Sequence, residues 1–347
     1  MRNLLACLAG AALAGCGGSA PDVTSAPAPS ADAIGVLTGV HPDGSRANLC
    51  TATLIGPHTV LAAKHCAETS SGPVLDKAPF FFEIGPDSAQ PTRSIRAVAA
   101  TGAPRADGGL FARGSDVAVF QLGEDVGDLV PYPVSDRVVG AADVGAVFTA
   151  VGYGIREPGQ TVNDLLTRRQ GGVTLQALTG HPLHVLFASS DALLAYVASV
   201  EGAAFVTASG STFVDSYDNP AGALLDGYEA YLGMGAGDLQ VCNLDSGGPM
   251  LRDVDGRPTL FGVSSRTWTG KPVPCLLGGV YALLGQPDNA QLLATALADE
   301  CRGVPTAGAC VFHTLARCTP PEEGPRRVVL TECPAACDAT GGAPACR

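Results

Sequence analysis

Residues 242–250 read "CNLDSGGPM", with Ser246 placed between an acidic residue and two glycines. A serine hydroxyl is a poor nucleophile at neutral pH and needs an adjacent base to remove its proton. If Ser246 is a nucleophile, other parts of the chain must supply that base and a group that orients it.

Two upstream stretches contain suitable groups. Residues 50–66 read "CTATLIGPHTVLAAKHC" and include His65, while residues 114–122 read "GSDVAVFQL" and include Asp116. An imidazole can take the serine proton, and a carboxylate beside it fixes the tautomer and stabilises the imidazolium. Asp107 is the rival carboxylate, but no apolar strand follows it. The sequence therefore predicts a catalytic triad of His65, Asp116 and Ser246.

Together, the three stretches resemble the Ala-x-His-Cys, Asp-(Ile/Val)-Ala and Asp-Ser-Gly-Gly-Pro motifs of the chymotrypsin/trypsin-like serine proteases, in the same order. The resemblance covers residues 34–300. It implies an all-β fold of two packed antiparallel six-stranded β-barrels with a C-terminal helix. It also implies a serine endopeptidase that cuts protein or peptide substrates through an acyl-enzyme and needs no metal or other cofactor.

The same resemblance assigns further residues. It implies two disulfides, Cys50–Cys66 beside the histidine and Cys242–Cys275 beside the specificity pocket. It places substrate-binding residues at the floor, strand and wall of that pocket, namely Gln240, Ser265, Thr267 and Gly279. Because the residue at the floor is uncharged, no preference for Lys or Arg is expected. The turn Gly152-Tyr153-Gly154 resembles the family's Gly-Trp-Gly turn.

One departure concerns the oxyanion hole, whose donors in this family match the backbone N–H groups of Leu244 and Ser246. The family has glycine where Leu244 stands, and leucine disfavours the positive φ that glycine tolerates. Loss of one oxyanion donor costs about 2.7–4 kcal/mol in the transition state. The sequence thus predicts a slower enzyme. Lys64 is a smaller departure, since the family has a small residue there, and its side chain is expected to be solvent-exposed.

A second departure concerns activation. In the family a freed Ile or Val amino terminus inserts beside the residue matching Asp245, but no Ile-Val-Gly-Gly motif precedes Cys50. The nearest candidate, residues 33–35, lies at a predicted strand. Asp245 is expected to have another partner, or the fold to assemble without cleavage. Both departures favour the alternative of a catalytically impaired, protease-like binding protein, whereas the complete triad favours the enzyme. Small-ester hydrolysis on the same triad is a third possibility.

The N-terminus predicts export. Residues 1–15 contain one early arginine and an apolar stretch of signal-peptide length. The run Leu13-Ala14-Gly15-Cys16 resembles the lipobox of bacterial lipoproteins, which implies cleavage before Cys16, a lipid on its sulfur, and attachment to the outer membrane or cell surface. An ordinary secretory signal is the alternative, and it would make the protein extracellular. Residues 16–33 are small, polar and Pro-rich, and predict a flexible tether.

Cysteine usage agrees with an oxidising compartment. Of the 12 cysteines, Cys7 is lost with the signal and Cys16 carries the lipid, which leaves an even number for pairing. Six of these lie within residues 301–347 and predict a small disulfide-rich C-terminal module of open connectivity. A zinc site is the rival interpretation, but no Cys-x2-Cys pair is present.

Charge excludes one class of partner. The formal net charge is −12 and no block of five Lys or Arg residues occurs, so nucleic-acid binding has no electrostatic support.

Short apolar runs between turns predict strands at 34–40, 51–55, 59–63, 80–84, 94–100, 117–122, 147–154, 173–178, 259–265 and 279–284.

Two helices are expected outside these strands. Residues 288–301 should form one helix, with Leu292, Leu293, Ala296 and Leu297 on its buried stripe, and residues 190–199 a second. Residues 180–235 are expected to hold an insertion. Its His181 and His184 fit a loop better than a metal site.

Overall fold

The computed structural model describes residues 32–41, 43–69, 72–104, 114–156, 161, 166–267, 275–324, 326–340 and 343–347. The predicted signal peptide, Cys16, all but the last two residues of the tether, and Asp107 lie outside these ranges.

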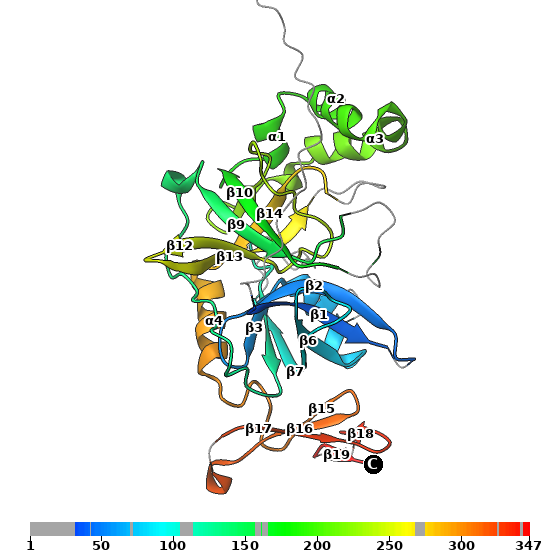
Figure 1. The fold of residues 1–347 in the computed structure, drawn as a ribbon, viewed down its shortest axis with the longest axis vertical. Coiled ribbons are helices and arrows are strands. Elements are labelled where there is room, and N and C mark those ends of the chain that lie inside the picture. Colours follow the sequence, from blue (N-terminus) through cyan, green and yellow to red (C-terminus); the bar gives the residue numbers. More distant parts are fainter. Residues whose placement is uncertain are drawn as a thin grey trace, which may run out of the picture.

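Six strands close the first barrel in the order β1-β2-β3-β8-β7-β6 (Figure 1). All neighbouring pairs are antiparallel. Bulky side chains such as Leu37, Phe82 and Phe120 are fully buried inside it. The strands are β1 (Ile34–Val40), β2 (Arg46–Leu54), β3 (Thr59–Ala62), β6 (Phe80–Ile84), β7 (Arg93–Gly102) and β8 (Ala118–Leu122).

Six more strands close a second antiparallel barrel in the order β10-β11-β14-β13-β12-β9. Its interior contains the edge-to-face pair Phe148 and Phe261, with ring centroids 5.8 Å apart. The strands are β9 (Val147–Gly152), β10 (Arg169–Ala177), β11 (Glu229–Leu232), β12 (Pro249–Val254), β13 (Arg257–Thr267) and β14 (Gly279–Leu283). The two-barrel, chymotrypsin-like fold predicted from the sequence is confirmed.

A shared apolar cluster joins the barrels. It brings Ile34 and Leu61 of the first barrel against Val151 and Leu260 of the second. Helix α4 (Pro287–Ala298) completes this cluster with Leu293 and lies next to β3 in Figure 1. Packing across this cluster joins the first barrel, next to which His65 and Asp116 lie, to the second barrel, whose strand β12 follows Ser246.

Helix α4 corrects the expected helix in two respects. It ends at Ala298 rather than at Cys301. Its buried face is formed by Leu293 and Ala296, whereas Leu297 is 41% exposed. The i, i+3 spacing of the buried pair matches one side of a helix, and Leu297 falls outside that narrow stripe.

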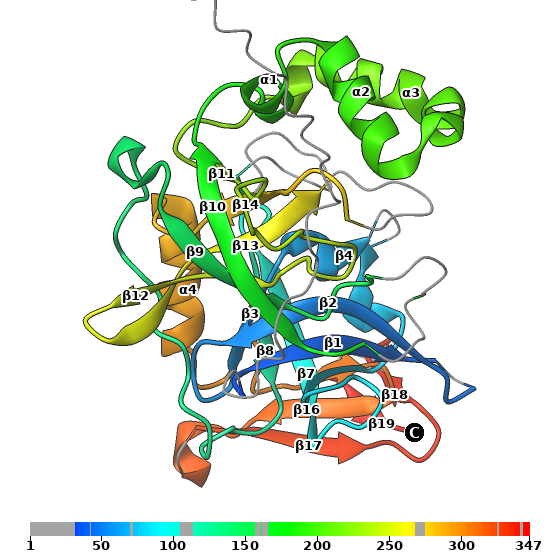
Figure 2. The ribbon, with the colours of Figure 1, turned by 45° about the horizontal axis from the view of Figure 1, so that its top comes forward.

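A helical insertion separates β10 from β11 and lies over the second barrel (Figure 2). It comprises α1 (Pro182–Leu186), α2 (Ser190–Glu201) and α3 (Ala203–Asp218). Helix α2 agrees with the expected helix at 190–199, while α3 was not predicted. Apolar side chains of the insertion, including Leu193 and Phe213, pack on Leu276 and Leu277 next to β14. The insertion therefore supports one wall of the predicted specificity pocket.

The remaining regular elements are short. They are β4 (Glu68–Thr69), β5 (Gly72–Pro73) and the 3-10 turns η1 (Lys64–Cys66), η2 (Val74–Asp76), η3 (Ala141–Asp143), η4 (Pro220–Gly222) and η5 (Pro321–Glu323).

The chain ends in two small sheets held by disulfides. One contains β15 (Ala309–Val311), β16 (Thr314–Cys318) and β17 (Val328–Glu332), and the other β18 (Cys337–Asp338) and β19 (Ala345–Cys346). The disulfides of this segment are Cys301–Cys318, Cys310–Cys337 and Cys333–Cys346.

This C-terminal segment packs against the first barrel. Arg96 of β7 pairs with Glu332 at 2.9 Å and donates to the carbonyl oxygen of Val311 at 3.0 Å. Val304, Val311 and other apolar residues of the segment belong to the core cluster of that barrel.

All ten described cysteines are in disulfides, which fits an oxidising, extracellular or periplasmic environment. Among the described residues, no helix has the length and apolarity needed to span a bilayer.

Candidate active site

His65 lies on the turn η1, directly after strand β3. The disulfide Cys50–Cys66 ties this turn to β2 across a sequence separation of 16 residues. The expectation of an exposed Lys64 is wrong. Its side chain is buried at 4% exposure, and its ammonium donates to the carbonyl oxygen of Ala103. The turn is thus fixed on both sides of the histidine.

Asp116 is 1% exposed and lies just before β8, beside His65. Its Oδ2 atom is 2.9 Å from Nδ1 of His65, and its Oδ1 accepts the backbone N–H of His65 at 3.0 Å. A contact with a carboxylate oxygen favours the tautomer that carries its proton on Nδ1, which places the lone pair on Nε2. The hydroxyl of Ser265 donates to Oδ2 at 2.5 Å and further fixes the carboxylate.

The loop that carries Ser246 is pressed against the strands beside His65. The N–H of Gly247 donates to the carbonyl oxygen of Ser264 at 2.7 Å. A Cβ atom at Gly247 would come within 2.4 Å of the Thr51 carbonyl oxygen and 2.9 Å of the Ala63 nitrogen. Only glycine can come this close to Thr51 and Ala63. Ala63 is two residues before His65 in the chain, so Gly247 lies near the start of the histidine turn. Ser246 itself is partly exposed.

Leu244 adopts the conformation that was expected to require glycine. Its φ is +74°, in the left-handed region. Its carbonyl oxygen accepts hydrogen bonds from the N–H and hydroxyl of Thr51, at 3.1 and 2.9 Å. Its side chain is buried in a cluster with Tyr153, Ile155 and Leu166. The expectation that leucine would prevent these dihedrals is therefore wrong.

The energies explain this outcome. A left-handed conformation costs a non-glycine residue about 1–2 kcal/mol. Burial of a leucine side chain contributes about 1.5–3 kcal/mol, enough to offset that cost. Within the described part of the chain, the N–H groups of Leu244 and Ser246 donate to no other group.

The turn Gly152-Tyr153-Gly154 receives the side chain of Asp245. A Cβ atom at Gly152 or Gly154 would lie 2.0 or 2.3 Å from a carboxylate oxygen of Asp245. Tyr153 is buried, and its hydroxyl donates to the carbonyl oxygen of Gly85 at 2.5 Å. Burial raises the pKa of Tyr153 to about 12, so the hydroxyl remains a donor at neutral pH.

Three of the predicted pocket residues, Gln240, Thr267 and Gly279, lie close together in the structure. Gln240 is buried, with its Oε1 accepting the N–H of Gly278 at 3.1 Å. The disulfide Cys242–Cys275 joins the two walls. The Thr267 hydroxyl lies 2.5 Å from the carbonyl oxygen of Gly278 and 3.2 Å from that of Val241. A Cβ atom at Gly279 would meet the Val241 side chain at 3.2 Å.

Sequence reasoning missed Arg266, which lies between two of the chosen strand residues. It forms an ion pair with the buried Glu229 of β11, with a second contact at 3.1 Å. Arg266 and Thr267 also line a hollow of about 250 Å³ that is closed on its other side by Asn219 and Gly222 of the insertion. A charged residue within an otherwise apolar strand was the only sequence signal for Arg266. Its partner Glu229 lies in no recognisable motif, so the ion pair could not be predicted.

The two insertion histidines have structural contacts. His181 caps α1 by accepting the N–H of Leu183 at 3.2 Å, and its ring stacks on His184. His184 lies 2.8 Å from the carbonyl oxygen of Tyr217 through Nε2. Near the triad residues, the sulfur atoms of Cys50 and Cys66 are close to His65, but their disulfide provides no thiolate for a metal.

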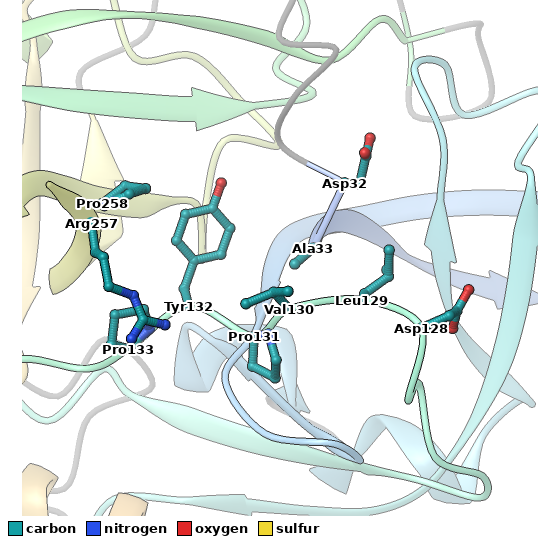
Figure 3. A pocket seen from close by; sticks show the side chains of 10 residues that line it. All are labelled: Asp32, Ala33, Asp128, Leu129, Val130, Pro131, Tyr132, Pro133, Arg257 and Pro258. Atoms are coloured by element: carbon teal, nitrogen blue, oxygen red, sulfur yellow. The ribbon is translucent and has the colours of Figure 1, made fainter.

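A separate hollow of about 370 Å³ lies at the connection between the barrels (Figure 3). Tyr132 and the prolines on either side of it line one wall, and Ala33 and Leu129 another. None of the candidate catalytic or substrate-binding residues contributes to it.

The chain was also compared with known proteins. No protein-family model and no curated protein matches this sequence.

Proposed function

We propose that this chain is an exported serine endopeptidase that uses His65, Asp116 and Ser246. The observation that carries the proposal is the buried Asp116 carboxylate bonded to Nδ1 of His65, which leaves Nε2 basic. The loop of Ser246 is held against the same turn by Gly247. The left-handed φ of Leu244 removes one of the two supports for the binding-protein alternative. The other support, the lack of an Ile-Val-Gly-Gly motif before Cys50, keeps that alternative as an outcome of the test.

In the proposed reaction, Nε2 of His65 takes the proton as the Ser246 hydroxyl attacks the substrate carbonyl carbon. Asp116 stabilises the imidazolium that forms. The backbone N–H groups of Leu244 and Ser246 donate to the developing oxyanion. His65 then protonates the leaving amine, and an acyl-enzyme on Ser246 is hydrolysed by water in the reverse sequence of proton transfers.

A fluorophosphonate probe tests this proposal. We expect the purified protein to form one adduct, which peptide mapping assigns to Ser246. A Ser246→Ala variant should remain unlabelled while keeping its thermal unfolding profile. An unlabelled wild-type protein, beside a control protease that reacts, would reject the enzyme and leave the binding function. Turnover of small esters without peptide cleavage would assign an esterase.

We also infer a preference for small side chains at the cleaved bond. The Thr267 hydroxyl contacts both pocket walls, and Gln240 closes the floor without a charge. Removing the Thr267 side chain should open this space. Because one methylene in an apolar pocket discriminates about 10–200-fold, Thr267→Gly should raise kcat/KM for leucine or phenylalanine substrates at least about tenfold over alanine substrates.

Thr267→Ser is the matched control, because it keeps the bridging hydroxyl. It should retain the wild-type preference in assays with alanine, leucine and phenylalanine peptide substrates. Equal turnover of all three substrates by the wild-type protein would contradict a narrow pocket.

We further propose that a lipid on Cys16 anchors the exported protein to a membrane surface. The proposal depends on the lipobox-like run before Cys16. Mass spectrometry of the mature N-terminal peptide should find a diacylglyceryl group on that sulfur, and an unmodified or absent Cys16 would leave a secreted protein instead.

A further inference from the structure

Asp245 is a buried carboxylate directly before the candidate nucleophile, at 6% exposure. Its Oδ1 accepts the N–H of Gly154 at 2.8 Å, and its Oδ2 accepts the N–H of Cys242 at 2.9 Å. An ionised carboxylate away from water is costly unless an opposite charge lies near it. Two neutral N–H donors favour the charged carboxylate but supply no positive charge, so a nearby cation would stabilise it further.

The first residues of β1 do not supply it. Ile34 pairs with Thr53 across the barrel and is fully buried. The carbonyl oxygen of Ala33 accepts the N–H of Leu54 at 2.8 Å. The backbone at Ile34 is thus already engaged in the first barrel.

Arg156 lies on the segment that is already bonded to the nucleophile loop. Gly154 donates to Asp245, and the next residue, Ile155, donates its N–H to the carbonyl oxygen of Asn243 at 2.8 Å. Arg156 follows directly, and all three nitrogens of its guanidinium are buried. The backbone contacts of Gly154 and Ile155 thus bring this positive charge close enough to interact electrostatically with the Asp245 carboxylate.

The electrostatic effects of the two groups are reciprocal. Burial raises the pKa of Asp245, and the positive charge of Arg156 opposes this rise. Burial lowers the pKa of Arg156, and the negative charge of Asp245 opposes this fall. Each group therefore favours the charged form of the other.

We propose that Arg156 is a positioning residue that holds Asp245, and with it the loop 242–248, in the reactive conformation without a cleaved amino terminus. The inference rests on the proposed function of that loop. Arg156 acts through Asp245 on the N–H groups of Leu244 and Ser246, and it does not contact the reacting atoms. The chain is then competent as it is exported, with no activating cut next to β1.

The test compares Arg156→Lys with Arg156→Met in the full chain, because the two side chains have similar length and only lysine is charged. Removing one partner of a buried charge pair is strongly destabilising. We expect Arg156→Met to label with the fluorophosphonate about 100-fold more slowly or worse, and Arg156→Lys to label within about tenfold of wild type. Hydrogen exchange of the peptide 242–248 should be faster in the methionine variant alone.

Equal labelling and equal exchange in the two variants would overturn the proposal. So would a wild-type chain with an uncleaved N-terminal fusion that labels only after the fusion is removed. If wild type never labels, the proposed function fails, yet the exchange comparison still tests Arg156. Should Arg156→Met not fold, the Arg156→Met, Asp245→Asn pair removes both charges and should recover folding and loop protection.

Discussion

Replacing His65 by alanine should lower kcat for peptide cleavage by about 10⁶-fold, since loss of the base in such a triad costs as much as loss of the nucleophile. Asp116→Asn should lower kcat by about 10⁴-fold. The asparagine amide would present a donor to Nδ1 and thereby favour the wrong imidazole tautomer. The hydrogen bond of 2.9 Å between Asp116 and Nδ1 is the geometry on which both values depend.

Steady-state kinetics with an alanine peptide substrate would measure these changes. Ser265→Ala is the matched control, because it removes one hydrogen bond to Asp116 and leaves the imidazole contact. A hydrogen bond to a charged group contributes about 1.5–3 kcal/mol, so kcat should fall by about 10–160-fold, far less than for His65→Ala. If the His65 and Ser265 variants lost activity equally, the assignment of His65 as the base would be wrong.

At position 244, an alanine variant should be less stable to unfolding than a glycine variant. This reverses the usual order, in which replacing alanine by glycine lowers stability. Leu244→Ala keeps the left-handed φ and removes the buried side chain, so the free energy of unfolding should fall by about 3 kcal/mol. Leu244→Gly loses the same contacts but relieves the backbone. We expect the glycine variant to be about 1 kcal/mol more stable than the alanine variant.

Urea unfolding would measure these stabilities, and probe labelling would measure the oxyanion hole. Since the backbone of Leu244 already has a glycine-like φ, Leu244→Gly should label at nearly the wild-type rate. Had leucine misplaced the donor, glycine would instead accelerate labelling by about 10²–10³-fold. Such an acceleration, or an alanine variant as stable as the glycine variant, would contradict the strained and packed conformation.

The sequence predicted the fold because its signals were local and repeated. Short apolar runs between turn residues located ten of the twelve barrel strands. The two missed strands are β11, of only four residues, and β12, which opens with a proline and carries Arg252 and Asp253. Helix α3 was missed because its buried face shows little periodicity, with Gly210 among its few buried residues.

The candidate site was predictable where residue type alone determines the chemistry. Ordered motifs were sufficient to predict the contact between His65 and Asp116, while the catalytic role of His65, Asp116 and Ser246 stays a prediction. The backbone dihedrals of Leu244 could not be predicted in this way, because they depend on a hydrogen bond from Thr51, which lies far away in the sequence. Lys64 was misjudged for the same reason, since its partner is the carbonyl of Ala103 on another segment. Arg156 gave no signal until the fold placed it near Asp245.

Leu244 has a consequence for how proteins with this fold are recognised in genomes. Glycine usually provides this left-handed backbone conformation, whereas here the packing around a leucine side chain stabilises it. Pattern searches that insist on the smallest residue two places before the serine will pass over such chains. Screens that score the shape of the loop, rather than its letters, should recover them.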